Sequence, residues 1–221
     1  MTRYWATNLA PARKGTVRII FRLRTTFAWF ALGVLATLAA CVWATPEPQL
    51  IREPRPDPVP MRIGVHFPPQ LRDFTYRHHF TDTAYVLGEP SVRLLKEALA
   101  LLFVEVVESP LPSPDSPLRG DLAGVIEPRI SSAGFKFPSP GSPSFPAHVT
   151  YGFTLYSSRG EQIASWDVTG QAGEPIANIF SPVSAVKRNF ELAMQEATLK
   201  LTSGFRKVPE VRRWLDEQGV R

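Results

Sequence analysis

The chain has a single cysteine, Cys41, among its 221 residues, so it can form no internal disulfide. A domain without disulfides must draw its stability from the burial of apolar side chains. The sequence also has no HxxxH or CxxC spacing, no phosphate-cradling glycine loop and no GxSxG nucleophile elbow. We therefore expect neither a metal ion nor another cofactor.

Histidine is scarce, with only four in the chain. Two of them, His78 and His79, are neighbours in a segment expected to be a strand, where adjacent side chains point to opposite faces. They cannot both ligate one metal ion from a regular strand. The other two, His66 and His148, have no partner at a ligand spacing.

A serine hydrolase would need a base and an orienting acid beside its nucleophile. His148 with Asp121 or Asp167 would supply those groups, but the nucleophile elbow is missing. The sequence therefore predicts a protein that is not an enzyme, and a hydrolase is the less favoured alternative.

Acidic residues are absent from positions 1–24, which carry six basic side chains, namely Arg3, Arg13, Lys14, Arg18, Arg22 and Arg24. The formal net charge of +5 depends on this segment, because without it nineteen basic residues face twenty acidic ones. A basic arm is also typical of nucleic-acid binding, which needs clustered positive charge. Here the arm precedes an apolar run and the remaining chain is near neutral, so we expect no nucleic-acid partner.

The apolar run covers residues 27–40 without a charge and ends in Leu38, Ala39, Ala40 and Cys41. A basic flank, a short apolar segment and small residues at its end are typical of a bacterial export signal. Two alternatives stay open. The run extends over eighteen residues to Ala44, enough for an uncleaved membrane helix, and a plain cleavage at a site such as Ala40 is the other. All three place the rest of the chain outside the cytoplasm.

The ending Leu38-Ala39-Ala40-Cys41 resembles the lipobox of bacterial lipoprotein precursors. The resemblance implies that residues 1–40 are removed between Ala40 and Cys41, and that acyl chains on Cys41 hold the protein on a membrane. Val42 follows the cysteine where an aspartate would favour retention in the inner membrane. By the enteric pattern this implies the periplasmic face of the outer membrane, with an inner-membrane anchor as the alternative.

Residues 45–60 contain six prolines, at positions 46, 48, 54, 56, 58 and 60. Proline fixes φ and removes a hydrogen-bond donor, which favours extended polyproline II. At about 3.1 Å per residue the segment would reach roughly 50 Å. We interpret residues 41–61 as the lipidated N-terminus and a tether, with a docking site for a proline-binding partner as the alternative reading.

Residues 62–221 are expected to form one globular domain, because about 160 residues suffice for a single hydrophobic core. Apolar residues at period two predict strands, and apolar residues at helical spacing predict helices. The predicted strands cover residues 62–67, 74–80, 103–108 and 122–130, followed by a hairpin of 149–155 and 163–170. The predicted helices cover residues 90–102, 181–204 and 209–218. Pro128 inside a strand indicates an edge position or a bulge.

This order predicts an α+β fold in which two main helices cover one face of a mostly antiparallel sheet. The order is similar to that of small envelope lipoproteins such as the lipopolysaccharide-assembly lipoprotein. That resemblance rests on element order alone. The lipobox, the long tether and the absence of catalytic motifs lead us to expect a binding or scaffolding role with an envelope protein as partner.

The aromatic residues Phe74, Tyr76 and Phe80 repeat at period two. They would either belong to the core or line a surface for a partner or a ligand. An apolar-ligand carrier, with a pocket between the sheet and the helix 181–204, is the alternative function.

Overall fold

The computed structural model describes residues 43–51, 57–78, 83–113, 115–116, 121–139, 143–175 and 182–220. The chain divides into two compact units, Met1–Cys41 and Val42–Arg221, and every described residue belongs to the second. The export segment and Cys41 lie outside the described residues, so their interpretation stays a prediction. No helix in the described part of the chain combines the length and the apolar character needed to cross a bilayer.

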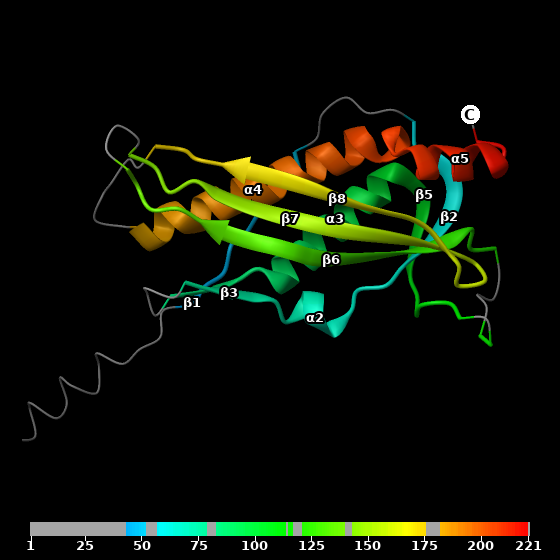
Figure 1. The fold of residues 1–221 in the computed structure, drawn as a ribbon, viewed down its shortest axis with the longest axis horizontal. Coiled ribbons are helices and arrows are strands. Elements are labelled where there is room, and N and C mark those ends of the chain that lie inside the picture. The colour runs from blue at the N-terminus through cyan, green and yellow to red at the C-terminus, as the bar shows by residue number, and fades with distance from the viewer. Residues whose placement is uncertain are drawn as a thin grey trace, which may run out of the picture. The chain divides into compact units, whose positions relative to one another are not determined.

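A five-stranded sheet forms the frame of the second unit, in the order β5-β2-β6-β7-β8 (Figure 1). The strands are β2 (Val59–Val65), β5 (Phe103–Glu108), β6 (Gly124–Phe135), β7 (Ala147–Ser157) and β8 (Gln162–Ala172). The long ladders β6–β7 and β7–β8 are antiparallel, which confirms the predicted fold class. β2 runs parallel to both of its neighbours, since the chain crosses over through a helix before it returns as β5.

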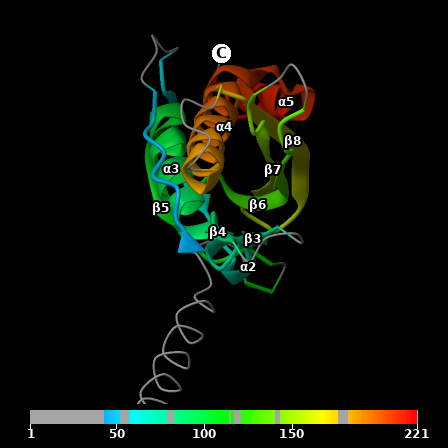
Figure 2. The ribbon, with the colours of Figure 1, turned by 90° about the vertical axis from the view of Figure 1, so that its left-hand side faces the viewer.

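Two long helices, α3 (Gly88–Leu102) and α4 (Pro182–Gly204), lie on the same face of this sheet (Figure 2), as predicted. Their apolar residues recur at helical spacing, so each helix has one continuous buried stripe. The predicted start of α4 at residue 181 lies outside the described residues. The stripe of α4 contains Val186, Phe190, Ala193, Met194, Ala197 and Leu201, each at most 1% exposed.

The helix layer lies directly against the sheet. A Cβ atom built on Gly170 of β8 would lie 1.9 Å from the carbonyl oxygen of Ala193, so the helix backbone touches the strand at this glycine. Across the same interface the hydroxyl groups of Tyr151 and Ser91 are hydrogen-bonded at 2.8 Å, which joins β7 to α3. At these points the helix layer and the sheet are in direct contact.

The C-terminal elements agree with the sequence. β7 and β8 form the predicted hairpin, whose turn contains Gly160 at a φ of +86°. A single 3₁₀ turn, η1 (Phe205–Lys207), links α4 to α5 (Pro209–Glu217). Three apolar residues of the predicted last helix, Val211, Trp214 and Leu215, are buried.

Pro128 lies in β6 beyond the end of its pairing with β2, where a residue without an N–H breaks no ladder hydrogen bond. The amide of His66 donates to the carbonyl of Ile126, so the backbone polar groups of Ile126 point toward β2. The backbone of Pro128, two positions later, points to the same side. The pairing with β2 ends at Ile126, and a bulge follows between Ile130 and Ser132. Pro128 thus lies on a locally unpaired side of β6, although β6 is the central strand of the sheet and the bulge lies two to four residues beyond the proline.

A small second sheet has the order β1-β4-β3, with β1 (Trp43–Ala44), β4 (Ala84–Val86) and β3 (Thr75–Arg77). Of the predicted strand over residues 74–80, Thr75–Arg77 form β3, Phe74 and His78 lie just outside it, and residues 79–80 lie outside the described part of the chain. A short helix, α2 (Pro69–Arg72), follows β2 where the sequence predicted no helix. Proline is well tolerated in the first turn of a helix, which is where Pro69 lies.

The start of the predicted tether is folded onto the domain, contrary to the expectation of a free, extended spacer. Ala44, Pro46 and Pro48 are buried while the residues between them are exposed, and the segment runs beside α3 and α4 (Figure 2). The amide of Glu47 donates to Glu191 of α4 at 2.9 Å. The buried proline rings form the apolar face with which this segment packs against the domain. The number of prolines in the sequence did not predict this packing.

The outer edge of β8 is capped by side chains of α4. Lys200 Nζ donates to the carbonyl of Thr169 at 2.9 Å, and the amide of Gln171 donates to the carboxylate of Glu196. Two of the edge groups that an incoming strand would need are thus already hydrogen-bonded.

We predict that Gly170→Ala destabilises the domain by about 3 kcal/mol, because the new methyl group would overpack the contact with Ala193. Gly204→Ala is the matched control. No atom lies within 4 Å of a Cβ at Gly204, whose φ of −103° suits any residue, and the change should be neutral or slightly stabilising. Urea unfolding of both variants checks this, and equal midpoints would contradict the close contact.

Candidate functional site

The predicted aromatic surface belongs largely to the core. Phe74 and Tyr76 are partly buried and pack against the hydrophobic cluster, while Phe80 lies outside the described residues. The ring of Tyr76 lies 5.7 Å from that of Phe190 on α4 and 6.0 Å from that of Phe135 on β6. It therefore fills the space between the small sheet and the helix layer.

Around Tyr76 the structure gathers a larger aromatic cluster, whose members are Tyr85, His78, Phe135, Phe137, Phe145 and Phe190. His78 is 6% exposed, and its ring lies 4.6 Å from Phe135 and 5.0 Å from Phe137. Phe137 is 51% exposed. One ring of the cluster thus reaches the surface.

Burial shifts the titration of the tyrosines in this region. Desolvation, with a smaller contribution from a charged Tyr76, raises the pKa of Tyr85 to about 12. Desolvation also raises the pKa of Tyr151, which is fully enclosed and hydrogen-bonded to Ser91. Both side chains are neutral hydroxyl groups at physiological pH.

An open groove of about 680 Å³ lies at the other end of the sheet. Four segments distant in sequence form its walls: the start of β2, residues 121–123, the β7–β8 turn and α5. Its apolar lining includes Met61, Leu122, Ile163 and Trp214, and its charged lining consists of Arg62, Asp121, Glu161 and Glu217. Trp214 lies within the predicted last helix, but the sequence gave no sign that a groove would form beside it.

Arg62 is the one cation among the described residues that line this groove, and it is already paired. Its Nη1 donates to Asp121 at 2.7 Å and its Nε lies 2.9 Å from a carboxylate oxygen of Glu105. The hydrogen bond from Arg62 lowers the pKa of Asp121, and the same bond raises the pKa of Arg62. With Arg62 neutralised in this way, Glu161 and Glu217 leave the groove acidic.

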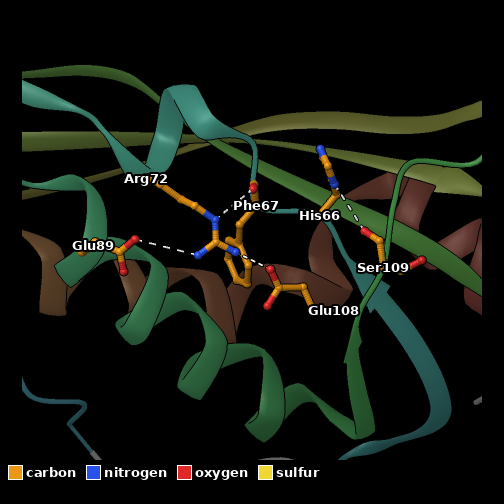
Figure 3. Close-up of polar contacts among 6 residues, drawn as sticks. All are labelled: His66, Phe67, Arg72, Glu89, Glu108 and Ser109. Carbon is orange, nitrogen blue, oxygen red and sulfur yellow. Dashed lines mark hydrogen bonds and ion pairs between the residues drawn. The ribbon is translucent and has the colours of Figure 1, made fainter.

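A second polar cluster is centred on Arg72 at the C-terminal ends of β2 and β5 (Figure 3). The Arg72 guanidinium pairs with Glu108, lies 3.8 Å from Glu89, and donates from Nε to the carbonyl of Phe67 at 3.3 Å. It also lies 5.6 Å from the centre of the Phe67 ring. These contacts join α2 to β5 and to the start of α3.

His66 lies beside this cluster, with Nδ1 3.3 Å from the carbonyl oxygen of Ser109 (Figure 3). The carboxylates around Arg72 face the guanidinium and not the histidine. The arrangement therefore holds elements together and brings no base to a nucleophile.

The groups considered for a hydrolase do not meet. His148 lies opposite Gln171 in the β7–β8 ladder, with its ring over Gly134. Asp167 lies 3.6 Å from Arg129 and accepts from Ser131 at 3.3 Å, and Asp121 pairs with Arg62. Within the described ranges, no three His, Cys, Asp or Glu side chains are grouped as metal ligands.

Comparison with known proteins gives structural likeness only. No family model and no curated protein matches the chain. A Xanthomonas campestris protein of the family DUF330 superposes with a TM-score of 0.51 at 14% identity, covering 80% of this chain and 99% of the other. A minor lipoprotein of Acinetobacter baumannii gives 0.44 at 10% identity, covering 71% and 95%. The first likeness shows a shared fold and leaves the activity open.

We predict that the stability of the domain falls as the pH rises above about 10, the pKa of an exposed tyrosine. The unfolded chain releases the Tyr85 proton near that pH, whereas the folded chain retains it up to a pKa of about 12. Stability is therefore complete below pH 10 and is lost progressively above it. Tyr85→Phe should flatten this fall. Unfolding midpoints at pH 8 to 11 measure the effect, and identical slopes in both proteins would contradict it.

Proposed function

We propose that this chain is a bacterial lipoprotein, held on the periplasmic face of a membrane by acyl chains on Cys41, that acts by binding another protein of the envelope. The observation that carries the proposal is the ending Leu38-Ala39-Ala40-Cys41 after a basic flank and an apolar run.

A binding role suits the polar clusters better than catalysis does. Arg62 and Arg72 each hold two carboxylates in ion pairs. A general base needs a neighbouring group from which to take a proton, and these carboxylates face guanidinium groups instead. The role is therefore one of contact, with no cofactor.

The groove beside α5 is the surface that we assign to the partner. It combines apolar side chains with an excess of carboxylates, so an extended segment with Lys or Arg residues and an apolar anchor fits it. Electrostatic complementarity of this kind chiefly selects the partner and speeds association.

We further propose that the mature protein resides in the outer membrane, because Val42 follows the acylated cysteine. An inner-membrane anchor would change the membrane and leave the binding role intact. Fractionation of the two membranes distinguishes these locations.

We predict that Cys41→Ser leaves the precursor unprocessed, because the thiol is both the acyl acceptor and part of the cleavage site. The wild-type protein should have a mass that corresponds to residues 41–221 plus acyl chains. The Cys41→Ser protein should retain residues 1–40. Intact-mass spectrometry and membrane fractionation read both results, and a wild-type N-terminus upstream of residue 41 would refute the lipoprotein assignment.

The groove can be tested with a photo-crosslinking amino acid at Glu161. We expect one discrete adduct with an envelope protein in cells, and a weaker adduct when Glu217→Lys reduces the negative charge. Glu217→Gln should have a smaller effect. The matched control carries the crosslinker at Ser165, an exposed residue farther along β8. Equal adducts from positions 161 and 165 would count against the groove.

A further inference from the structure

The folded domain begins almost at the proposed site of acylation. Only Val42 separates Cys41 from β1, and consecutive Cα atoms are about 3.8 Å apart. The Cα atom of Trp43 therefore lies within about 8 Å of that of Cys41. β1 is itself fixed by pairing with β4, Trp43 opposite Ala84 and Ala44 opposite Tyr85. No long spacer separates the anchor from the domain.

Exposed rings mark the same end of the domain. Trp43 is 57% exposed and Phe137 is 51% exposed, although they come from distant parts of the sequence. Arg77 and His78 are consecutive at the end of β3, and each contacts one of the two rings. Because adjacent strand residues point to opposite faces, Trp43 and Phe137 flank this end of the domain from two sides. The guanidinium of Arg77 lies 5.3 Å from the centre of the Trp43 ring, and the ring of His78 lies 5.0 Å from that of Phe137. We call Trp43, Arg77 and Phe137 the anchor-end patch.

The chemistry of this patch suits the headgroup layer of a bilayer. Indole rings favour the membrane interface, where the apolar ring is buried and the N–H stays wet. Arg77 provides a cation for lipid phosphates, and the exposed Lys136 provides another next to Phe137. The patch bears both of the features that attract a protein surface to anionic phospholipids.

We infer that the anchor-end patch rests on the phospholipid headgroups of the leaflet that holds the acyl chains. The inference depends on the proposed acylation of Cys41 and adds the orientation of the domain. β7 extends from Ala147, near the patch, to Ser157 at the groove, and its eleven residues span roughly 35 Å at about 3.3 Å each. The acidic groove therefore faces away from the membrane, toward a partner in the periplasm.

The test uses the acylated mature protein in vesicles of phosphatidylethanolamine and phosphatidylglycerol with brominated acyl chains. Trp43 is replaced by Phe, because it lies close to the anchor in any orientation, and Phe137→Trp supplies the probe. We expect the emission of the introduced indole to shift to shorter wavelength and to be quenched by the brominated lipid. The Trp43→Phe protein alone gives the background from Trp166 and Trp214.

Leu111→Trp in the same background is the matched control, since Leu111 is 37% exposed. It lies in the loop after β5, whose neighbour Pro112 is next to Gly160 of the hairpin turn, at the groove end. We expect no quenching there. If Phe137→Trp fails to fold, Lys136→Trp serves as the probe at the adjacent exposed position.

The outcomes separate the two proposals. Quenching at 137 and not at 111 supports the inference. Absence of quenching at 137, or equal quenching at both positions, overturns it and leaves the lipoprotein assignment intact. A mature protein without acyl chains would refute the assignment itself.

Discussion

The contact between the backbone of α4 and β8 sets the geometry of the whole domain. Gly170 has no side chain, so the helix rests on the strand at Ala193 and its apolar stripe fills the concave face of the sheet. Because α4 lies this close to the sheet, Phe190 is in contact distance of Tyr76 and Tyr85. It also presents Glu191 to the amide of Glu47, so the segment after β1 is held against the same helix.

The elements with strong local patterns could be predicted from the sequence, and those that depend on distant contacts could not. The period-two apolar residues of β7 predict one buried face of the strand, and the helical spacing of the apolar residues of α4 predicts one buried face of the helix. Each pattern can bury all of its apolar residues in only one orientation of the element. The segment at residues 43–51 also alternates, but its buried positions include Pro46 and Pro48, and proline is normally a sign of an extended spacer. The conformation of this segment is determined by its contacts with the rest of the domain and not by its local pattern.

The groove shows the same limit more clearly. Its walls come from four segments, and its central ion pair joins Arg62 to Asp121, 59 positions apart. Nothing in the neighbourhood of either residue predicts the other.

The aromatic residues at period two were easier to recognise than to interpret. Their spacing predicts one face of a strand but does not say whether that face meets solvent or α4. The two ends of the domain differ in chemistry. Aromatic rings and a cation lie at the end near β1 and β3, and carboxylates line the groove at the other end.

The side chains that cap the outer edge of β8 would have a consequence if the protein is confined to a membrane surface, as we propose. Molecules restricted to two dimensions collide far more often than the same number in solution, and exposed strand edges would then join them into fibrils. Lys200 and Glu196 already occupy the carbonyl of Thr169 and the amide of Gln171. An approaching strand would have to break these bonds first, so on this side a dense population of the molecules can stay dispersed.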